Sequence, residues 1–483
     1  MKLILDPATT ARPATVDANV TEAGGGTRYN IRLDGATVAT ARATKAGTLS
    51  VGVAISASAA LGAHTVQVRD SSNKVTLASA TLSVADVIVV PPPVWPYATL
   101  QAAIDATPSG GTLVLPSGRV FAESARITKP MTLDCNGAAI DGTGRPYWIE
   151  VAASDVTILN PICRTATTPV QNGALRFLPG TARGKVSGGD LSGSFGAAIA
   201  FGNANQTIVE NVNIHDNGQL GVHLGGDGVH GIGNVLRNCH VHHNNAPLDG
   251  TWNGIAHGAN DPEWEAGGVK ATRQTNLTFD SNEVDHNGGP GLWMDIYGQA
   301  TQYLGNRCHD NTHAGIMEEV SYNGIIRGNA CWKNGFGKAV WAWGCGILIS
   351  SSTGTIAENN VTAWNARGGV AVLSQNRQDW PGVKPISNIK VRNNVDAMLD
   401  NVYSNAWLED FAGGMFDLAR GNTGSGNRYW NAIPEDSRWR FAYGSSYGKL
   451  ADFNATYGEE GGTYLTDAQK DAVLTAAGIP VAP

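Results

Sequence analysis

Two residue patterns repeat along the middle of this chain with a shared period of about 23 residues. In one, an asparagine follows a short apolar run: Asn211, Asn238, Asn282, Asn306, Asn329, Asn359 and Asn394. In the other, a glycine precedes Val, Leu or Ile: Gly268, Gly291, Gly315, Gly346 and Gly369. Patterns with one common period predict a stacked repeat, and short β-branched runs at this spacing are typical of a right-handed parallel β-helix. Asparagines at one position of successive coils are expected to form a ladder of amide hydrogen bonds.

The composition suits a β-rich repeat with many turns. Glycine accounts for 60 of the 483 residues, and only 16% of the residues are charged. The net charge of −7 and the absence of a Lys/Arg cluster argue against a nucleic-acid partner. No stretch approaches the ~20 apolar residues of a membrane span. The first residues, MKLILDPATTARP, are too short for the apolar core of a secretion signal. Either a signal was removed and a Met restored, or the protein leaves the cell by another route, such as release within a virus particle.

The chain divides into four expected segments. Residues 1–88 contain short alternating runs separated by turns, which predicts an immunoglobulin-like β-sandwich. Residues 89–97 form a Pro-rich linker. Residues 98–430 hold the β-helix, and a helix over 99–107 is expected to cover its open end. Residues 431–483 are expected to form a C-terminal cap with a short helix.

Three further details follow from the repeat. The interval between Asn238 and Asn282 is about twenty residues too long for one coil, so residues 245 to 266 are expected to project as a loop of the kind that is often functional. Cys308 and Cys331 fall at equivalent positions of successive coils, which predicts core thiols, with a disulfide as the alternative. The segment HVHHNN is interpreted as surface polar residues.

The glycine pattern also determines which side chains face outward. The residue after each glycine is apolar and faces the core, so the second and fourth residues face out because side chains alternate along a strand. The second position holds Lys270 and Trp293, and the fourth holds Asp295 and Glu319, in both cases on neighbouring coils. Neighbouring strands lie about 4.8 Å apart, near the roughly 5–5.5 Å between the carboxyl groups of retaining glycosidases. Glu318 should point inward, as a buried partner of Lys270 or Arg273, unless the strand ends there.

A carboxylate pair, a lysine and an aromatic ring on one face predict a site that acts on a sugar chain. Asp295 and Glu319 can serve as acid and base in hydrolysis. Alternatively, they bind Ca²⁺ while Lys270 removes a proton beside a uronic acid carboxylate, which is elimination. The sequence is compatible with both routes. The alternative interpretation is that these outward charges are ordinary solvated surface residues. Like charges on adjacent strands are unfavourable, however, unless another group offsets them.

The residues expected around this pair come from several coils. Glu265, which arrives from the long loop, joins Asp295, Glu319 and Lys270 as a catalytic candidate. The expected substrate-binding residues are Trp264, Trp293, Arg273, His313 and Tyr322. No set of metal ligands is assigned.

Several segments also carry a resemblance. They are TLQAAIDATPSGGTLVLPSG, EAGGVK, GPGLWMDI, HAGIMEEVSYNGIIRGN and SYGKLADFNATYG. In these segments the chain resembles right-handed parallel β-helix proteins of the pectate-lyase-like superfamily, and the resemblance covers about residues 98 to 460. Asp295 and Glu319 are the acids that match the recurring family pattern. No signature of the pectate lyases proper is present.

The resemblance implies a protein that acts on a polysaccharide, because the superfamily includes polysaccharide lyases, hydrolases and bacteriophage tailspikes. A small β-domain before a β-helix is similar to the layout of tailspikes, which are usually trimers. That layout implies an extracellular or virion-borne homotrimer, attached to tail or baseplate proteins through residues 1–88, that recognises and depolymerises bacterial surface glycan. The expected partner is a bacterial or other acidic polysaccharide. Two alternatives stay open: a secreted bacterial polysaccharide lyase or glycoside hydrolase, and a non-catalytic receptor-binding or structural β-helix.

Overall fold

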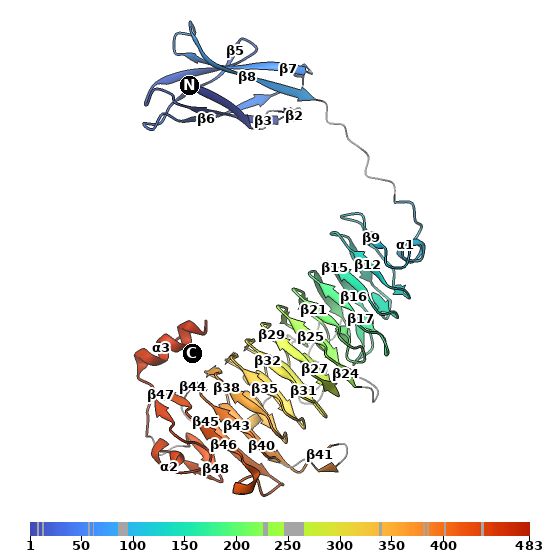
Figure 1. The fold of residues 1–483 in the computed structure, drawn as a ribbon, viewed down its shortest axis with the longest axis vertical. Coiled ribbons are helices and arrows are strands. Elements are labelled where there is room, and N and C mark those ends of the chain that lie inside the picture. Colours follow the sequence, from blue (N-terminus) through green and yellow to red (C-terminus); the bar gives the residue numbers. More distant parts are fainter. Residues whose placement is uncertain are drawn as a thin grey trace. The chain divides into compact units, whose positions relative to one another are not determined.

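The computed structural model contains two compact units, Met1–Pro96 and Tyr97–Pro483 (Figure 1). It describes the chain apart from residues 7–8, 12–13, 57, 61, 86–94, 226–229, 246–264, 338–340, 380–381, 384–385, 400–401 and 436–438. Most of the projecting loop expected at 245 to 266 thus lies outside the described residues. Among the helices in the described part of the chain, none has the length and apolar character needed to cross a membrane.

The first unit is a β-sandwich. One sheet is antiparallel, in the order β1 (Lys2–Asp6), β3 (Ala14–Thr21) and β6 (Leu49–Ile55). The other has the order β2 (Thr9–Ala11), β8 (Thr76–Ala85), β7 (Gly62–Asp70), β4 (Arg28–Leu33) and β5 (Ala36–Arg42), with only the β2–β8 pair parallel. Both sheets contribute to one apolar core, in which Val16, Val53 and Val66 are buried. The predicted β-sandwich is confirmed.

Each coil of the second unit adds one strand to each of three sheets, whose strand pairs are parallel apart from the last pair of the third sheet (Figure 1). The first sheet contains β9 (Thr112–Val114), β12 (Met131–Asp134), β15 (Val156–Leu159), β18 (Lys185–Ser187), β21 (Ile208–Glu210), β25 (Val235–Arg237), β29 (Thr278–Asp280), β32 (Gln302–Leu304), β35 (Ile325–Arg327), β38 (Ile356–Glu358), β43 (Lys390–Arg392) and β46 (Thr423–Ser425). The second sheet contains β10 (Val120–Phe121), β13 (Ala139–Gly142), β16 (Ile162–Ala166), β19 (Asp190–Ser194), β22 (Asn213–His215), β26 (His240–His242), β30 (Glu283–Asp285), β33 (Arg307–His309), β36 (Ala330–Trp332), β39 (Val361–Ala363), β44 (Val395–Met398), β47 (Arg428–Asn431) and β50 (Thr463–Tyr464). The third sheet contains β11 (Ala125–Ile127), β14 (Ile149–Val151), β17 (Gly173–Phe177), β20 (Ala197–Ala200), β23 (Leu220–Leu224), β27 (Gly267–Thr272), β31 (Leu292–Asp295), β34 (Ile316–Glu319), β37 (Cys345–Ser350), β40 (Gly368–Gln375), β45 (Tyr403–Asp410), β48 (Phe441–Tyr443) and β49 (Ser445–Tyr447).

The predicted register is present in the third sheet. The apolar residues that follow the pattern glycines stack coil on coil and are buried: Val269, Leu292, Ile316, Ile347 and Val370. In the second sheet, Cys308 pairs in register with Cys331, and both are buried free thiols, as predicted. The right-handed parallel β-helix expected from the repeat is confirmed.

The asparagine ladder exists, but the sequence pattern mixes two positions. Its buried members are Asn282, Asn306, Asn329, Asn360, Asn394 and Asn427, linked by side-chain amide bonds of 2.9–3.0 Å. Asn211, Asn238 and Asn359 instead occupy the preceding left-handed turn position, with φ of 57°, 51° and 56°. A side chain in that turn leaves the core, so Asn360, and not Asn359, carries the ladder in its coil.

A second ladder explains the glycine pattern. It runs through Asn217, Asn244, Asn287, Asn311, Asn334 and Asn365, between the second and third sheets. A Cβ atom on Gly268, Gly291 or Gly315 would lie 2.8–3.0 Å from an amide nitrogen of this ladder, closer than side chains normally approach. The glycines therefore recur because the ladder amides pass beside the backbone there.

The ends of the second unit carry its helices. Helix α1 (Leu100–Ala106) begins where the Thr99 side chain accepts from the backbone of Ala102, and it covers the first coil as expected. Helix α3 (Asp467–Ala476) packs beside the second sheet, with Lys470 close to two tryptophan rings of that face. The remaining short elements are α2 (Leu450–Asn454), the 3-10 turns η1 (Trp341–Gly344) and η2 (Leu418–Arg420), and the strand pairs β24 (Gly231–Ile232) with β28 (Gln274–Thr275) and β41 (Gln378–Asp379) with β42 (Gly382–Val383).

Candidate active site

A groove crosses the outer face of the third sheet. It consists of one pocket of about 840 Å³ that extends from β14 to β31 and a second of about 470 Å³ that extends from β27 to β40. The two are continuous because Glu265, Lys270, Asp295 and Ile296 line both. We call this surface the groove.

The strand register places the predicted catalytic side chains in two neighbouring columns. Lys270 pairs with Trp293 across β27 and β31. Met294 pairs with Glu318 across β31 and β34, which sets Asp295 and Glu319 beside each other one residue further on. All four outward residues of this set line the 470 Å³ pocket.

Lys270 occupies the centre of the site. Its Nζ lies 3.3 Å from Asp295 Oδ2 and 3.6 Å from Glu265 Oε2. The same atom lies 3.9 Å from the centre of the Trp293 ring, a cation–π contact. The ammonium group therefore offsets the charge of Asp295, whose other oxygen, Oδ1, accepts no hydrogen bond from any described residue.

Glu319 has a different environment. The Trp293 indole Nε1 donates to its Oε2 at 3.1 Å, and the Arg377 guanidinium contacts its Oε1. Burial raises the pKa of Glu319 to about 7, and the charge of Asp295 adds to that rise, although Arg377 and Lys270 oppose it. The two carboxyl groups thus differ in their partners, which is the condition for separate acid and base roles.

The outward face beyond the carboxyl groups is not a solvated surface. The column of Lys270 and Trp293 continues in register through Met317 and Leu348, and these residues form a buried apolar cluster with Ala342 of η1. The same turn brings Trp343 to the groove. The interpretation of outward charges as solvated does not extend to this face, because η1 packs over the third sheet.

Several further residues line the groove. Arg377 follows the end of β40, and its partner Glu319 is 58 residues earlier. Gln375 and Trp343 also line the 470 Å³ pocket. His223 lines the 840 Å³ pocket and pairs in register with Lys270. His223 and Gln375 lie in strands of the third sheet, whereas Trp343 lies in η1 and Arg377 lies in the segment after β40.

The remaining predicted residues divide into three groups. Arg273 lines the 840 Å³ pocket. Trp264 lies outside the described residues. His313 and Tyr322 do not line the groove, because His313 is buried in the turn before β34 and Tyr322 lies in the turn after it, against Tyr297.

Glu318 points inward, as alternation requires, and a hydrogen-bond partner of its carboxyl group in the core is Tyr303. It is fully buried, and the Tyr303 hydroxyl donates to its Oε2 at 2.8 Å. Lys270 faces the opposite side of the sheet, where it contacts Asp295. Burial and this neighbouring carboxyl group raise the pKa of Tyr303 well above its usual value.

The donor set in the groove does not fit Ca²⁺. This ion takes six to eight oxygen ligands, whereas each carboxyl group here already contacts a cationic side chain, Lys270 on Asp295 and Arg377 on Glu319. Within the described residues, the side-chain clusters with metal-ligand spacing lie on the second sheet and not in the groove. The chemistry of the groove is therefore derived from its side chains alone.

Comparison with known proteins agrees with this architecture. A family model described as "Right handed beta helix region" matches residues 177–360 and 261–406. The chain contains a right-handed parallel β-helix. A comparison with curated protein sequences finds no match.

Three solved structures illustrate the likeness. The A-module of mannuronan C-5 epimerase AlgE6 from Azotobacter vinelandii is 17% identical, with a TM-score of 0.54, and the match covers 76% of this chain and 94% of that chain. A structure of XylC with xylose is 10% identical, with a TM-score of 0.50 and coverage of 72% and 83%. The Dettilon tailspike protein gp208 is 10% identical, with a TM-score of 0.45 and coverage of 67% and 62%. At these identities the likeness concerns the fold alone.

Proposed function

We propose that the protein is an enzyme that hydrolyses an acidic polysaccharide in the groove. The observation that carries this proposal is the pair Asp295 and Glu319: two buried carboxyl groups of neighbouring coils line one pocket but have different partners. Burial and the Asp295 charge raise the pKa of Glu319 to about 7, while Lys270 offsets the charge on Asp295. Carboxyl pairs that differ in this way act as acid and nucleophile in glycosidases.

The proposed reaction has two steps. Protonated Glu319 gives its proton to the glycosidic oxygen as the bond to the leaving sugar breaks, and Asp295 attacks the anomeric carbon to form a glycosyl ester. Glu319, now ionised, then takes a proton from water, which attacks the ester and releases Asp295. The strand spacing of about 4.8 Å favours this retaining route over an inverting one, which needs room for water between the carboxyl groups.

The lining of the groove supports a charged sugar polymer as substrate. Lys270, Arg273 and Arg377 provide cationic groups along it. Trp343 adds an aromatic ring in the 470 Å³ pocket, of the kind that packs against sugar rings. The groove spans several coils, which suits a chain of linked sugars better than a single small molecule.

Product analysis on a panel of uronate-containing polysaccharides tests the reaction class. Hydrolysis is expected to produce new reducing ends without new ultraviolet absorbance. Elimination, with Lys270 as the base, would instead leave an unsaturated sugar that absorbs in the ultraviolet. An epimerisation, the activity named for the AlgE6 module, would change the proton NMR spectrum without shortening the chain. Either of the last two results would contradict hydrolysis.

The activity should depend on pH through Glu319. Because the general acid must be protonated, we expect kcat/KM to fall as pH rises through about 7. The folded-state pKa lies above the ordinary 4.5, so the stabilisation from protonated Glu319 is complete below 4.5 and is lost as pH rises through about 7. Melting temperatures across this range should decline in the natural protein, and Glu319→Gln should remove that part of the decline. A decline of equal size in Glu319→Gln would contradict the assignment.

We also infer where the protein acts. The layout of a β-sandwich followed by a β-helix supports a phage-borne, extracellular depolymerase of bacterial surface glycan that is attached to tail proteins through residues 1–88 and assembled as a homotrimer. Light scattering of the full chain tests the assembly. A mass near 50.5 kDa, that of one chain, would contradict the trimer.

A further inference from the structure

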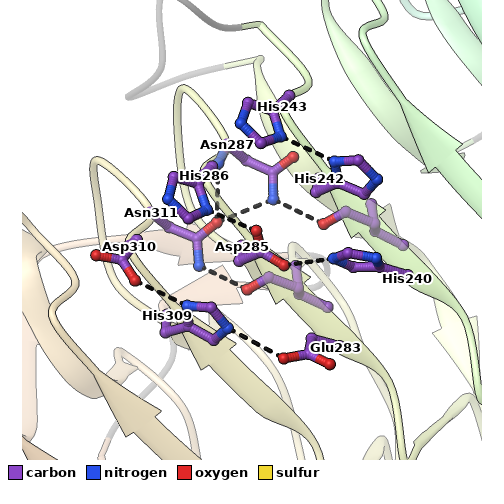
Figure 2. A network of polar contacts seen from close by, with 12 residues as sticks. His240, His242, His243, Glu283, Asp285, His286, Asn287, His309, Asp310 and Asn311 are labelled. Carbon is purple, nitrogen blue, oxygen red and sulfur yellow. Dashed lines mark hydrogen bonds and ion pairs between the residues drawn. The ribbon is translucent and has the colours of Figure 1, made fainter. Parts of the chain in front are cut away.

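A second cluster of ionisable side chains lies on the outer face of the second sheet, away from the groove on the third. It contains six of the chain's 11 histidines: His215, His240, His242, His243, His286 and His309. Carboxylates alternate with these rings, as Figure 2 shows for Glu283, Asp285 and Asp310. We call this set the histidine patch. The hydrolysis proposed for the groove uses none of it.

Each ring at one end of the histidine patch is oriented by a carboxylate. Nδ1 of His286 donates to Oδ1 of Asp285 at 2.6 Å. Nε2 of His309 donates to Oε1 of Glu283 at 3.2 Å, and its Nδ1 lies 2.8 Å from Oδ2 of Asp310 (Figure 2). One nitrogen of each ring is thereby oriented by a carboxylate, Asp285 for His286 and Glu283 for His309, and a metal bound to His309 Nδ1 and Asp310 would replace the hydrogen bond between those two groups.

We propose that His286, His309 and Asp310 form a binding site for a divalent transition metal of the Zn²⁺ type. One ligand atom from each side chain lies within 4.8 Å of the other two. Ligand atoms around tetrahedral Zn²⁺ are about 3.4 Å apart, given metal–ligand distances of about 2.1 Å. The side chain of His286 is 50% exposed, so it has room to rotate over the remaining distance.

The partners of these rings match the arrangement found around protein-bound zinc. A metal-binding histidine normally donates its other ring N–H to a carboxylate, which fixes the ring and raises its basicity. Asp285 takes this role for His286, and Glu283 takes it for His309. Two imidazoles and one carboxylate, with an open fourth position, are a ligand set that Zn²⁺ and its neighbours in the transition series favour over Ca²⁺ or Mg²⁺.

A competing set in the same patch fits less well. Glu283, Asp285 and His309 also offer ligand atoms within 4.8 Å of one another. Both oxygens of Asp285, however, already accept hydrogen bonds at 2.6 Å, one from His240 and one from His286. A metal at that set would compete with the His240 or His286 bond to Asp285, whereas a metal on His286, His309 and Asp310 replaces the His309–Asp310 bond and leaves Asp285 and Glu283 to orient the two rings. The ion would then link the turns of two successive coils.

Titration of the full, chelator-treated chain with ZnCl₂ tests the site by calorimetry and by thermal melting. We expect one saturable Zn²⁺ site per chain and a melting temperature that rises with Zn²⁺, because the ion binds the folded state. His286→Gln, His309→Gln and Asp310→Asn should each weaken Zn²⁺ binding by roughly tenfold or more. Co²⁺ should give a visible absorption spectrum that these substitutions remove.

His240→Gln is the matched control. The His240 side chain is 46% exposed, against 50% for His286, and each ring makes one 2.6 Å bond to Asp285. Only His286 is a proposed ligand, so His240→Gln should keep the Zn²⁺ affinity within about threefold, less than the loss of a ligand or its carboxylate costs. Equal weakening by both substitutions, or the absence of saturable binding, would overturn the site. The site would also be overturned if Glu283→Gln weakened Zn²⁺ binding while His286→Gln had no effect. That result would assign the ion to Glu283, Asp285 and His309.

Discussion

Asp295→Asn and Glu319→Gln are each expected to lower kcat for polysaccharide cleavage by roughly 10²- to 10⁴-fold. Asparagine cannot form the glycosyl ester, and glutamine cannot donate the proton that burial keeps on Glu319 near neutral pH. Because the two groups act in one step, the double variant should be little worse than the poorer single variant. Single-turnover rates on a defined oligosaccharide measure this directly.

Binding and folding must be followed in the same variants. Both substitutions keep the shape of the side chain, so the Kd for the uncleaved glycan and the circular dichroism spectrum should remain close to those of the natural protein. Glu358→Gln is a matched control, since Glu358 is also a buried carboxyl group but pairs with Arg327 and Arg392 on the first sheet, outside the groove. Full activity in Asp295→Asn or Glu319→Gln, or a comparable loss in Glu358→Gln, would contradict the assignment.

The parts of the site that follow the repeat were predictable from the sequence. Alternation along a strand and register between coils are local rules, and together they place Lys270 and Trp293 in one outward column and Asp295 and Glu319 in the next. Residues that reach the groove between coils follow no such rule. Arg377 contacts Glu319 from the end of β40, and the path of that chain segment depends on tertiary packing.

Polar residues in turns were the least predictable from sequence. Asn359 and Asn360 are adjacent and chemically identical, yet one occupies a left-handed turn and the other the buried ladder. The choice depends on where the strand ends, to a precision of one residue, and apolar periodicity does not give that precision. The interpretation of HVHHNN as surface polar residues holds for His240 and His243, which are exposed, but not for Asn244 and Asn245, which are buried. The histidine rings of this segment have partners on coils that are distant in sequence, such as Asp285 for His240, and a sequence pattern does not reveal such partners.

The ladder position itself should be among the most sensitive in the second unit. The Asn360 Oδ1 accepts from the backbone N–H and the amide of Asn329, both at 2.9 Å. Its Nδ2 donates to Asn394 Oδ1 and to the Ile326 carbonyl, also at 2.9 Å. All of these groups are buried, so Asn360→Ala leaves several donors and acceptors without partners, each at about 1–3 kcal/mol. We expect the free energy of unfolding to fall by about 4 kcal/mol in total.

The adjacent residue provides the control for that loss. Asn359 is exposed, and its backbone has a φ of 56°, which glycine adopts without strain. Asn359→Gly should therefore change the free energy of unfolding by less than about 1 kcal/mol. Urea unfolding followed by circular dichroism compares the two variants under the same conditions. If Asn359→Gly were the more damaging substitution, the ladder would run through Asn359, and the register of the coils around β38 and β39 would be shifted by one residue.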